Sequence, residues 1–139
     1  MAQWTDEAEH IMRERFGKDS LIALATAIAG TPYARTVNAF YDRGAFFILT
    51  DARSNKIRQL ADNPYAAIAG DWFTGHAKAQ CLGALAAPEN RAVSEKMRAV
   101  FSSWIDNGHS NPEDPNTVIL RLELTDGVLF SHGTRYSFP

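Results

Sequence analysis

The stretch from Thr50 to Pro64, TDARSNKIRQLADNP, places hydroxyl, amide and cationic side chains together at the start of a predicted short helix. The residues in or near its first turn include Ser54, Asn55, Lys56 and Arg58. A helix N-terminus already carries partial positive charge, so cations there are unfavourable unless an anion is bound. Free backbone N–H groups and these side chains together suit a phosphate. Arg58 lies about 200° round the helix from Lys56 and is expected to point to solvent.

A second cation is expected close to this helix start. Arg35 begins the first strand of a predicted hairpin over 34–50, in which DRG is the turn signal. If the two strands pair along their length, Arg35 lies near Thr50, and Arg35, Ser54 and Lys56 converge on one anion. The alternative is a capped helix with solvated cations, and the spacing by itself leaves both interpretations open.

Composition excludes several classes of protein. The 139 residues form one domain by length, 1–139, with a hydrophobic fraction of 45% that is typical of globular proteins. The net charge of −2 argues against a general nucleic-acid or anionic-membrane surface, which would carry a basic excess. A single cysteine permits no internal disulfide, and the N-terminus MAQWTDEAEH does not resemble a signal peptide or a membrane span. We therefore expect no nucleic-acid partner, no membrane partner and a cytoplasmic location.

The elements that must position these residues are about six strands and three helices. Helices are expected over 5–17, over 54–63 and from 88 to about 104, and strands over 20–30, 34–41, 45–50, 65–70, 76–87 and in one or two segments of 117–139. A turn is expected at TDG, 125–127, and a loop over 106–116. The strands are joined mostly by hairpins, without a regular βαβ rhythm. This favours a mainly β fold with flanking α-helices, an antiparallel barrel or sheet, over a doubly wound fold.

The order and spacing of these motifs resemble the flavin-binding split-barrel family typified by pyridoxamine 5′-phosphate oxidase. In that family an arginine opens a strand, an aromatic-rich strand ends in threonine, and a Ser-x-Lys-x-x-x-Leu-x-x-Asn-Pro helix precedes a glycine-centred strand. The corresponding residues here are Arg35, Thr50, Ser54, Lys56, Leu60, Asn63, Pro64 and Gly83. The likeness covers about residues 20–87, and the small size looks most like the general-stress-protein branch.

The resemblance implies a six-stranded antiparallel split β-barrel that forms a homodimer, with FMN in the grooves between subunits. Carried over by position, it implies that Arg35 and Lys56 hold the FMN phosphate, while Ser54 and Asn55 add hydrogen bonds from the helix start. Contacts to the flavin ring are implied for Thr36, Val37, Asn38, Leu49 and Thr50.

Two departures from the family pattern concern the ring and the substrate. Ala77 and Lys78 stand where the full oxidases have an Arg-Gln pair. Lys78 either reaches the pyrimidine edge of the flavin, where a cation favours the reduced ring, or is a solvated lysine on the outer face. The sequence around Arg135 does not match the segment with which the oxidases hold the substrate phosphate. Oxidation of pyridoxine phosphate itself is therefore not expected.

No catalytic residue and no metal site are predicted. Metal-ligand spacing is absent among the four histidines, His10, His76, His109 and His132. Cys81 lies mid-strand and is expected to be a core residue rather than a nucleophile. Trp72 is expected to plug the barrel mouth or to cover a flavin face, and Trp104 to lie on the core face of its helix.

Three functions are compatible with these features. The first is an FMN-dependent oxidoreductase that passes electrons from a reduced nicotinamide or a similar small donor to a small acceptor. The second is a non-catalytic binding protein for FMN or for haem, with His76 or His132 facing the groove. The third is a structural dimer with an empty groove. The phosphate anchors do not separate FMN from a deazaflavin, whereas an absorbance spectrum of the purified protein separates flavin, haem and an empty groove.

Overall fold

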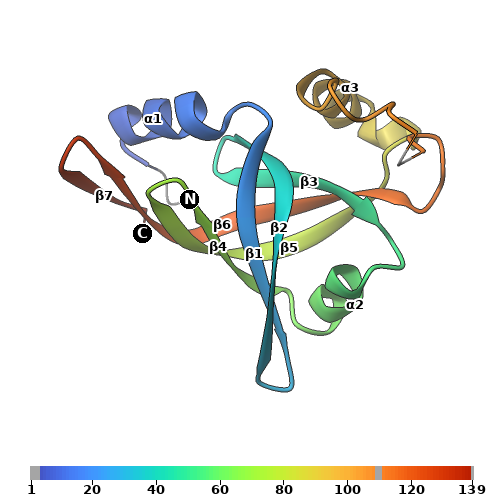
Figure 1. Cartoon of the computed structure of the whole chain (residues 1–139), viewed down its shortest axis with the longest axis horizontal. Helices are drawn as coiled ribbons and strands as arrows, with labels where there is room; N and C mark the ends of the chain where they lie inside the picture. The colour runs from blue at the N-terminus through green and yellow to red at the C-terminus, as the bar shows by residue number, and fades with distance from the viewer. Residues whose placement is uncertain (1–3, 109–110, 139) are drawn as a thin grey trace.

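The computed structural model describes residues 4–108 and 111–138, and Figure 1 shows how the elements are arranged. In chain order they are α1 (Asp6–Phe16), β1 (Ser20–Ile28), β2 (Thr31–Asp42), β3 (Ala45–Asp51), α2 (Asn55–Asp62), β4 (Tyr65–Gly70), β5 (Phe73–Ala84), the 3-10 turn η1 (Pro88–Asn90), α3 (Arg91–Val100), β6 (Thr117–Ser131) and β7 (Thr134–Phe138). His109, in the expected loop, lies outside the described residues. None of the helices in the described ranges is long and apolar enough to span a membrane.

The strands of the described residues form one antiparallel sheet, in the order β3-β2-β1-β4-β5-β6-β7. β3 also pairs with β6 along its whole length, Ala45–Asp51, and this pairing closes six strands into a barrel. β7 pairs only with β6 and lies outside the closed ring (Figure 1). The expected six-stranded antiparallel split barrel with flanking helices is confirmed, and the structure adds a seventh strand.

The barrel opens between β2 and β3. β2 pairs with β1 over Thr31–Ala39, but with β3 only over Phe40–Asp42. The outer edge of Thr31–Ala39 therefore has no partner strand in the described part of the chain. The long hairpin expected over 34–50 is wrong in this respect, because β3 leaves β2 after three residue pairs and follows β6 instead.

Alternate side chains of β3 point into two different clusters. Phe46 and Ile48 belong to the core inside the barrel, whereas Phe47 packs in a second cluster beneath α3. α1 covers one end of the barrel with Ala8, Met12 and Phe16. α2 lies at the other end (Figure 1), where its one fully buried side chain is Leu60.

The helix ends follow their sequence signals. Thr5 caps α1 by accepting a hydrogen bond from the backbone N–H of Ala8 at 3.2 Å, and the helix stops at Gly17. Ser54 caps α2 in the same way through the N–H of Ile57, at 3.4 Å. α2 ends before Asn63 and Pro64, as the sequence predicts.

The C-terminal strands turn later than expected. TDG at 125–127 is not a turn, because β6 runs through it with an irregularity at Thr125. Gly127 lets Phe73 pack directly over the strand, since a Cβ at this position would lie only 3.0 Å from the Phe73 ring. The turn is instead formed by His132 and Gly133, whose φ angles of 50° and 80° suit a two-residue hairpin.

Trp72 does not plug the barrel mouth, contrary to the sequence-based expectation. It lies in the tight turn between β4 and β5, with a φ of 53°, and it is 72% exposed. The next residue, Phe73, points inward and is 2% exposed. The Phe73 ring packs against the rings of Trp4, Phe16 and Phe46. Phe73 therefore fills the place that the sequence assigned to its neighbour.

The two adjacent aromatics provide a test of this placement. Phe73→Ala is expected to lower the free energy of unfolding by about 3–5 kcal/mol, because it removes a fully buried ring. Trp72→Ala is expected to change it by no more than about 0.5 kcal/mol, because the indole is exposed. Urea unfolding followed by circular dichroism measures both values. Similar losses in the two variants would contradict the inward position of Phe73.

Candidate functional site

Three segments that are distant in the sequence meet at the barrel end beside α2. β2 carries Arg35, β3 carries Thr50 near its end, and the first turn of α2 carries Lys56. Lys56 Nζ donates a hydrogen bond to Thr50 Oγ1 at 2.6 Å, and Thr50 Oγ1 lies 3.5 Å from Ser54 Oγ. Arg35 is close enough to Lys56 for their charges to interact. We call Arg35, Thr50, Ser54 and Lys56 the cation cluster.

Arg35 is held in place by neutral groups. Its Nη1 donates to Thr26 Oγ1 at 2.8 Å and to the Leu24 carbonyl at 3.3 Å, and its Nη2 donates to Gln59 Oε1 at 3.2 Å. Thr26 also donates to Gln59 Oε1, at 2.5 Å. In the described residues no carboxylate forms an ion pair with Arg35, so its charge is oriented without being neutralised.

The electrostatics of the cluster favour a negative group beside it. Burial, and then the neighbouring charge of Arg35, lower the pKa of Lys56. Asp51 acts in the opposite direction, but its carboxylate is already bound by Arg53 Nη2 at 2.8 Å. Hydrogen bonds from Arg53 lower the pKa of Asp51 to about 2, so Asp51 remains an anion committed to Arg53. Arg35 and Lys56 therefore repel each other, and a bound anion would relieve that repulsion.

The start of α2 adds to the same field. Its first turn contains no acidic residue, and the first N–H groups of any helix lack intrahelical acceptors. Asn55 is exposed and its Oδ1 accepts a hydrogen bond from Arg58. Arg58 is exposed as well and is not part of the cation cluster. The first turn of α2 therefore presents Ser54 and Lys56 to the cluster, while Asn55 and Arg58 contact each other at the surface.

The other residues implied for the flavin ring occupy varied positions. Thr36 is exposed, Val37 packs partly against the barrel core, and Leu49 packs against the cluster under α3. Asn38 Nδ2 donates to Asp19 Oδ1 at 2.9 Å, which fixes this side chain. The backbone of 36–38 lies on the edge of β2 that has no β3 partner, so main-chain groups there are available to a ligand.

Lys78 lies on the outer face of β5, while its neighbour Ala77 is buried inside the barrel. In the sheet it stands opposite Tyr65 of β4 and Glu123 of β6. Lys78 is exposed, and no hydrogen bond or ion pair in the described residues joins it to the cation cluster. Within one chain, the structure does not bring Lys78 together with the cation cluster.

Cys81 is exposed, so the expectation that it belongs to the core is wrong. The pairing of β4 with β5 ends at Tyr65 and Lys78, and Cys81 lies beyond that point with only β6 beside it. Trp104 is partly buried just after α3 and donates through Nε1 to Asp19 at 3.0 Å.

The histidines are at the surface where they are described. His76 Nδ1 lies 3.0 Å from Asp126 Oδ1, with both side chains more than half exposed. His132 occupies the exposed turn between β6 and β7. Across residues 4–108 and 111–138, no three His, Cys, Asp or Glu side chains are grouped so as to hold a metal ion.

Sequence reasoning missed Thr26 and Gln59. Thr26 is the polar residue at an inward position of the alanine-rich strand β1 and is 2% exposed. Gln59 follows Lys56 by three residues, which puts both on the same side of α2. A buried threonine in an apolar strand and a glutamine on the cationic helix face are the signals that point to an arginine-orienting pair.

Comparison with known proteins agrees with this architecture. A family model described as pyridoxamine 5′-phosphate oxidase matches residues 8–129. General stress protein 26 of Bacillus subtilis is 28% identical over 114 residues, covering 81% of this chain and 81% of its own length.

Solved structures share the fold at lower identity. A FAD-binding protein from Mesorhizobium loti superposes with a TM-score of 0.69 at 13% identity, covering 100% of this chain and 99% of its own. A pyridoxamine 5′-phosphate oxidase-related, FMN-binding protein from Nostoc punctiforme has a TM-score of 0.63 at 16% identity, covering 95% and 88%. HutZ, the heme storage protein from Vibrio cholerae, has a TM-score of 0.63 at 20% identity, covering 85% and 87%. At these identities the likeness is one of fold.

The repulsion in the cation cluster predicts a pH-dependent effect of Lys56→Met on the ligand-free protein. Because the pKa of Lys56 is lowered in the folded state, its ammonium charge opposes folding at neutral pH. Lys56→Met is therefore expected to gain stability relative to wild type near pH 7. The gain should disappear as pH rises through the lowered pKa towards 10.5, the ordinary lysine value, because wild type then loses the charge.

Urea midpoints of both proteins across this pH range measure the effect, in a buffer without multivalent anions. Arg58→Met removes an exposed charge from the same helix and serves as the matched control, with a stability difference that stays constant over the same range. If the stability difference between Lys56→Met and wild type is also independent of pH, the charge of Lys56 does not oppose folding of the ligand-free protein.

Proposed function

Because the chain belongs to the pyridoxamine 5′-phosphate oxidase family, we propose that it binds FMN with the phosphate on the cation cluster and transfers electrons at the interface of a homodimer. The observation that carries the proposal is the pair of cations, Arg35 and Lys56, which no described carboxylate neutralises, beside a helix start without acidic residues. A dianionic phosphate has the charge and the acceptor oxygens that this arrangement lacks.

Each member of the cluster has a distinct part in holding the phosphate. Arg35 is already oriented by Thr26 and Gln59, so its guanidinium loses little freedom on binding an oxygen. Lys56 supplies a second charge, and the backbone N–H groups at the start of α2 complete the site. The Ser54 hydroxyl, which caps the helix, lies within reach of the same anion.

The flavin ring is proposed to lie along the open edge of β2. The main chain over Thr36–Asn38 directs the N–H and C=O groups of alternate residues to that edge, and Leu49 and Thr50 of β3 flank the gap. FMN, when bound, supplies the hydride and electron chemistry, with a reduced nicotinamide or a similar small molecule as donor and a small molecule as acceptor. The chain's own residues bind and orient the cofactor, and we assign no catalytic acid or base.

The dimer is supported by the outer face of β1 and β4. Leu21 and Tyr65 are 64% and 59% exposed on this face. Between them lie small residues that pair across the strands, Ala23 with Ala69 and Ala25 with Ala67. An exposed apolar face of this kind, lined with small side chains, suits packing against a second copy.

Lys78 projects from the same outer side of the sheet and is proposed to meet the partner's flavin. The free, exposed Cys81 suits a reducing compartment, and we propose the cytoplasm as the location.

The second candidate is a non-catalytic carrier of FMN or haem, and the likeness to a heme storage protein favours keeping it. Haem iron needs an axial ligand, for which we keep His76 and His132, the two histidines identified from the sequence. The absorbance spectrum of the purified protein distinguishes the cofactors, because flavin gives a double band in the blue and haem one sharp intense band. Steady NAD(P)H consumption by the FMN-loaded protein distinguishes an enzyme from a carrier.

Lys56→Ala is expected to weaken FMN binding by roughly 10- to 150-fold, the equivalent of losing one charge-assisted contact of about 1.5–3 kcal/mol. Arg35→Ala is expected to have an effect of the same order. Arg58→Ala, the matched control, is expected to leave the Kd nearly unchanged, because Arg58 contacts Asn55 outside the cluster. Titrations followed by flavin fluorescence give the three constants.

Riboflavin, which has the same ring and no phosphate, shows whether the lost affinity comes from the phosphate contact. The losses caused by Lys56→Ala and Arg35→Ala should shrink for riboflavin, because no phosphate contact remains to be lost. If Lys56→Ala binds FMN as tightly as wild type, or loses riboflavin and FMN equally, the cluster is not the phosphate site.

Light scattering is expected to give a homodimer mass at micromolar concentration. Leu21→Arg should shift this mass towards the monomer and weaken FMN binding, because it places a charge on the proposed interface. Lys18→Arg, an exposed residue just before β1, is the control that keeps the charge. A wild-type monomer at micromolar concentration would contradict the dimer and with it a flavin site between subunits.

A further inference from the structure

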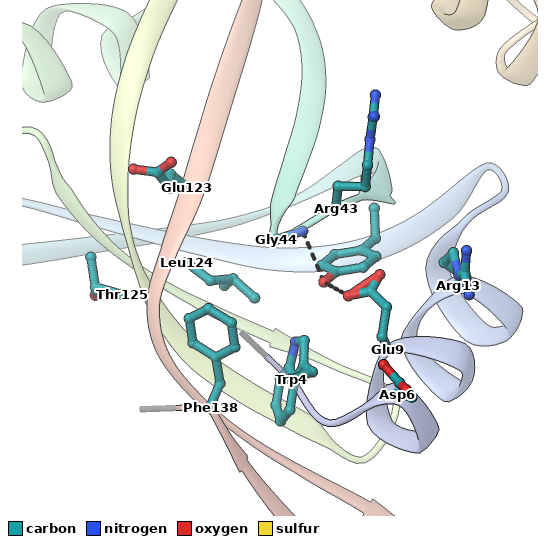
Figure 2. Close-up of a pocket in the computed structure, with 11 residues that line it drawn as sticks. Trp4, Asp6, Glu9, Arg13, Arg43, Gly44, Glu123, Leu124, Thr125 and Phe138 are labelled. Atoms are coloured by element: carbon teal, nitrogen blue, oxygen red, sulfur yellow. Dashed lines mark hydrogen bonds between the residues drawn. The ribbon is translucent and has the colours of Figure 1, made fainter. Parts of the chain in front are cut away.

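The short pairing of β2 with β3 over Phe40–Asp42 lies between two polar regions that differ in one respect. Beyond the turn, a cavity of about 590 Å³ lies beneath α1 and is lined by Gly44 (Figure 2). The Tyr41 hydroxyl at this cavity is engaged within the fold, because it donates to Glu9 Oε1 at 2.6 Å and accepts from the Gly44 N–H at 2.9 Å, as the dashed lines show. In the other direction the open edge of β2 begins, and its first polar side chain, Asn38, is engaged only in part.

The side-chain amide of Asn38 has a defined orientation. Its Nδ2 lies 2.9 Å from Asp19 Oδ1. A carboxylate only accepts hydrogen bonds, so the amide nitrogen faces Asp19 and the carbonyl oxygen faces away from it. No hydrogen bond among the described residues uses this oxygen, Oδ1, and Asn38 is only half-buried. An acceptor is therefore left open beside the unpaired edge of β2.

Asp19 is itself held on both of its oxygens. Trp104 Nε1 donates to Asp19 Oδ2 at 3.0 Å, and the Trp104 ring packs against the fully buried ring of Phe101, with centroids 4.8 Å apart. No Lys, Arg or His of the described ranges forms an ion pair with Asp19. One carboxylate thus joins the segment before β1, the segment after α3 and the open edge of β2 through two neutral donors.

Asn38 lies further along β2 from the cation cluster, where the ring of a bound flavin is proposed to lie. Arg35 and Asn38 are three residues apart on this strand, which corresponds to about 10 Å. In FMN a ribityl chain separates the phosphate from the ring, so a phosphate at Arg35 leaves room for the ring towards Asn38. The pyrimidine part of the flavin ring carries one N–H donor, at N3, and the open oxygen of Asn38 is the complementary acceptor.

We propose that Asp19 is a positioning residue for the flavin ring, because it holds Asn38 so that Asn38 Oδ1 accepts a hydrogen bond from the N3–H of the ring. This inference rests on the proposed FMN site and adds a contact to the ring that does not depend on the phosphate. Asn38 touches the ligand, whereas Asp19 and Trp104 act through it. A flavin with a methyl group on N3 lacks the donor and is disfavoured.

The test compares FMN with 3-methyl-FMN, which carries the same phosphate and differs only at N3. Titrations followed by flavin fluorescence give both Kd values for each protein, and the readout is their ratio. We expect wild type to bind FMN about 10-fold more tightly than 3-methyl-FMN. Asn38→Leu removes the acceptor and is expected to bind the two flavins with Kd values within about 2-fold of each other.

Asp19→Asn separates positioning from contact. The new amide offers a donor as well as an acceptor, so it no longer dictates which end of the Asn38 amide faces it. The preference for FMN should fall by about 3-fold or more, although Asn38 is unchanged. Asp106→Asn removes an exposed carboxylate close to Trp104 in the sequence and is the matched control, with the wild-type ratio expected. A loss of stability alone alters both Kd values together and leaves their ratio as it is.

The proposal is overturned if wild type binds FMN and 3-methyl-FMN equally, if Asn38→Leu keeps the preference, or if Asp106→Asn lowers it as much as Asp19→Asn. Equal binding of the two flavins by wild type contradicts the ring contact and leaves the proposed phosphate site standing. Failure of wild type to bind FMN contradicts the proposed function and the ring contact with it. The comparison of wild type with Asn38→Leu keeps the proposal falsifiable if Asp19→Asn does not fold.

Discussion

The pairing of β3 with β6 determines the rest of the molecule. β3 follows β6 along its entire length and shares only three residue pairs with β2. This choice closes the barrel and at the same time leaves one edge of β2 without a neighbour. A closed sheet normally hides its main-chain groups, but among the described residues the edge over Thr31–Ala39 lacks a partner strand, as does the edge of β5 beyond Lys78.

The two ends of β3 lie beside different parts of the molecule. The turn that precedes it lines the cavity beneath α1 through Gly44, and Thr50 near its end belongs to the cation cluster beside α2. Between these ends, Phe46 and Ile48 fill the barrel while Phe47 supports α3. A single strand, buried on both faces, therefore holds two polar regions apart at a fixed separation. The rigid middle gives each end a stable support for side chains that remain partly exposed.

The sequence predicts most of the barrel because alternation and turn signals are local. The strand over 45–50, the start of α2 at Ser54 and its end before Asn63 all follow from short-range pattern. Arg35 was expected near the same point through a long hairpin, yet it arrives there through Gln59 of α2. The approach of Arg35 to the start of α2 was predicted, but from a pairing of β2 with β3 that does not extend that far. β3 pairs with β6 instead, and periodicity does not reveal which strands pair.

Errors concentrate where burial depends on how far a neighbouring element extends. Trp72 and Phe73 are adjacent aromatics, and only the position of the turn decides which one points inward. Cysteine is a residue type that is often buried, but Cys81 lies past the end of β4, where β5 has lost one neighbouring strand. Thr26 and Gln59 were missed since their role exists only once β1 and α2 are packed together. The local sequence shows which side chains of a strand alternate between its two faces. The neighbouring strands and helices determine which of these side chains are buried.

The brevity of α2 has a consequence for how the molecule opens. A helix of eight residues is marginal in water, and Leu60 is its one fully buried side chain. The hydrogen bonds of Gln59 to Thr26 and Arg35 add to the packing of Leu60 and Ile57 and to the bond from Lys56 to Thr50 in attaching α2 to the barrel. If α2 detaches as a local unit, Lys56 leaves Thr50 and Arg35 loses its hydrogen bond to Gln59, but Arg35 keeps its bonds to Thr26 and Leu24 of β1. An anion bound to the cluster therefore stabilises the docked position of α2. Conversely, a contact that stabilises docked α2 increases the affinity for the anion by the same factor, because anion binding and docking of α2 are linked equilibria.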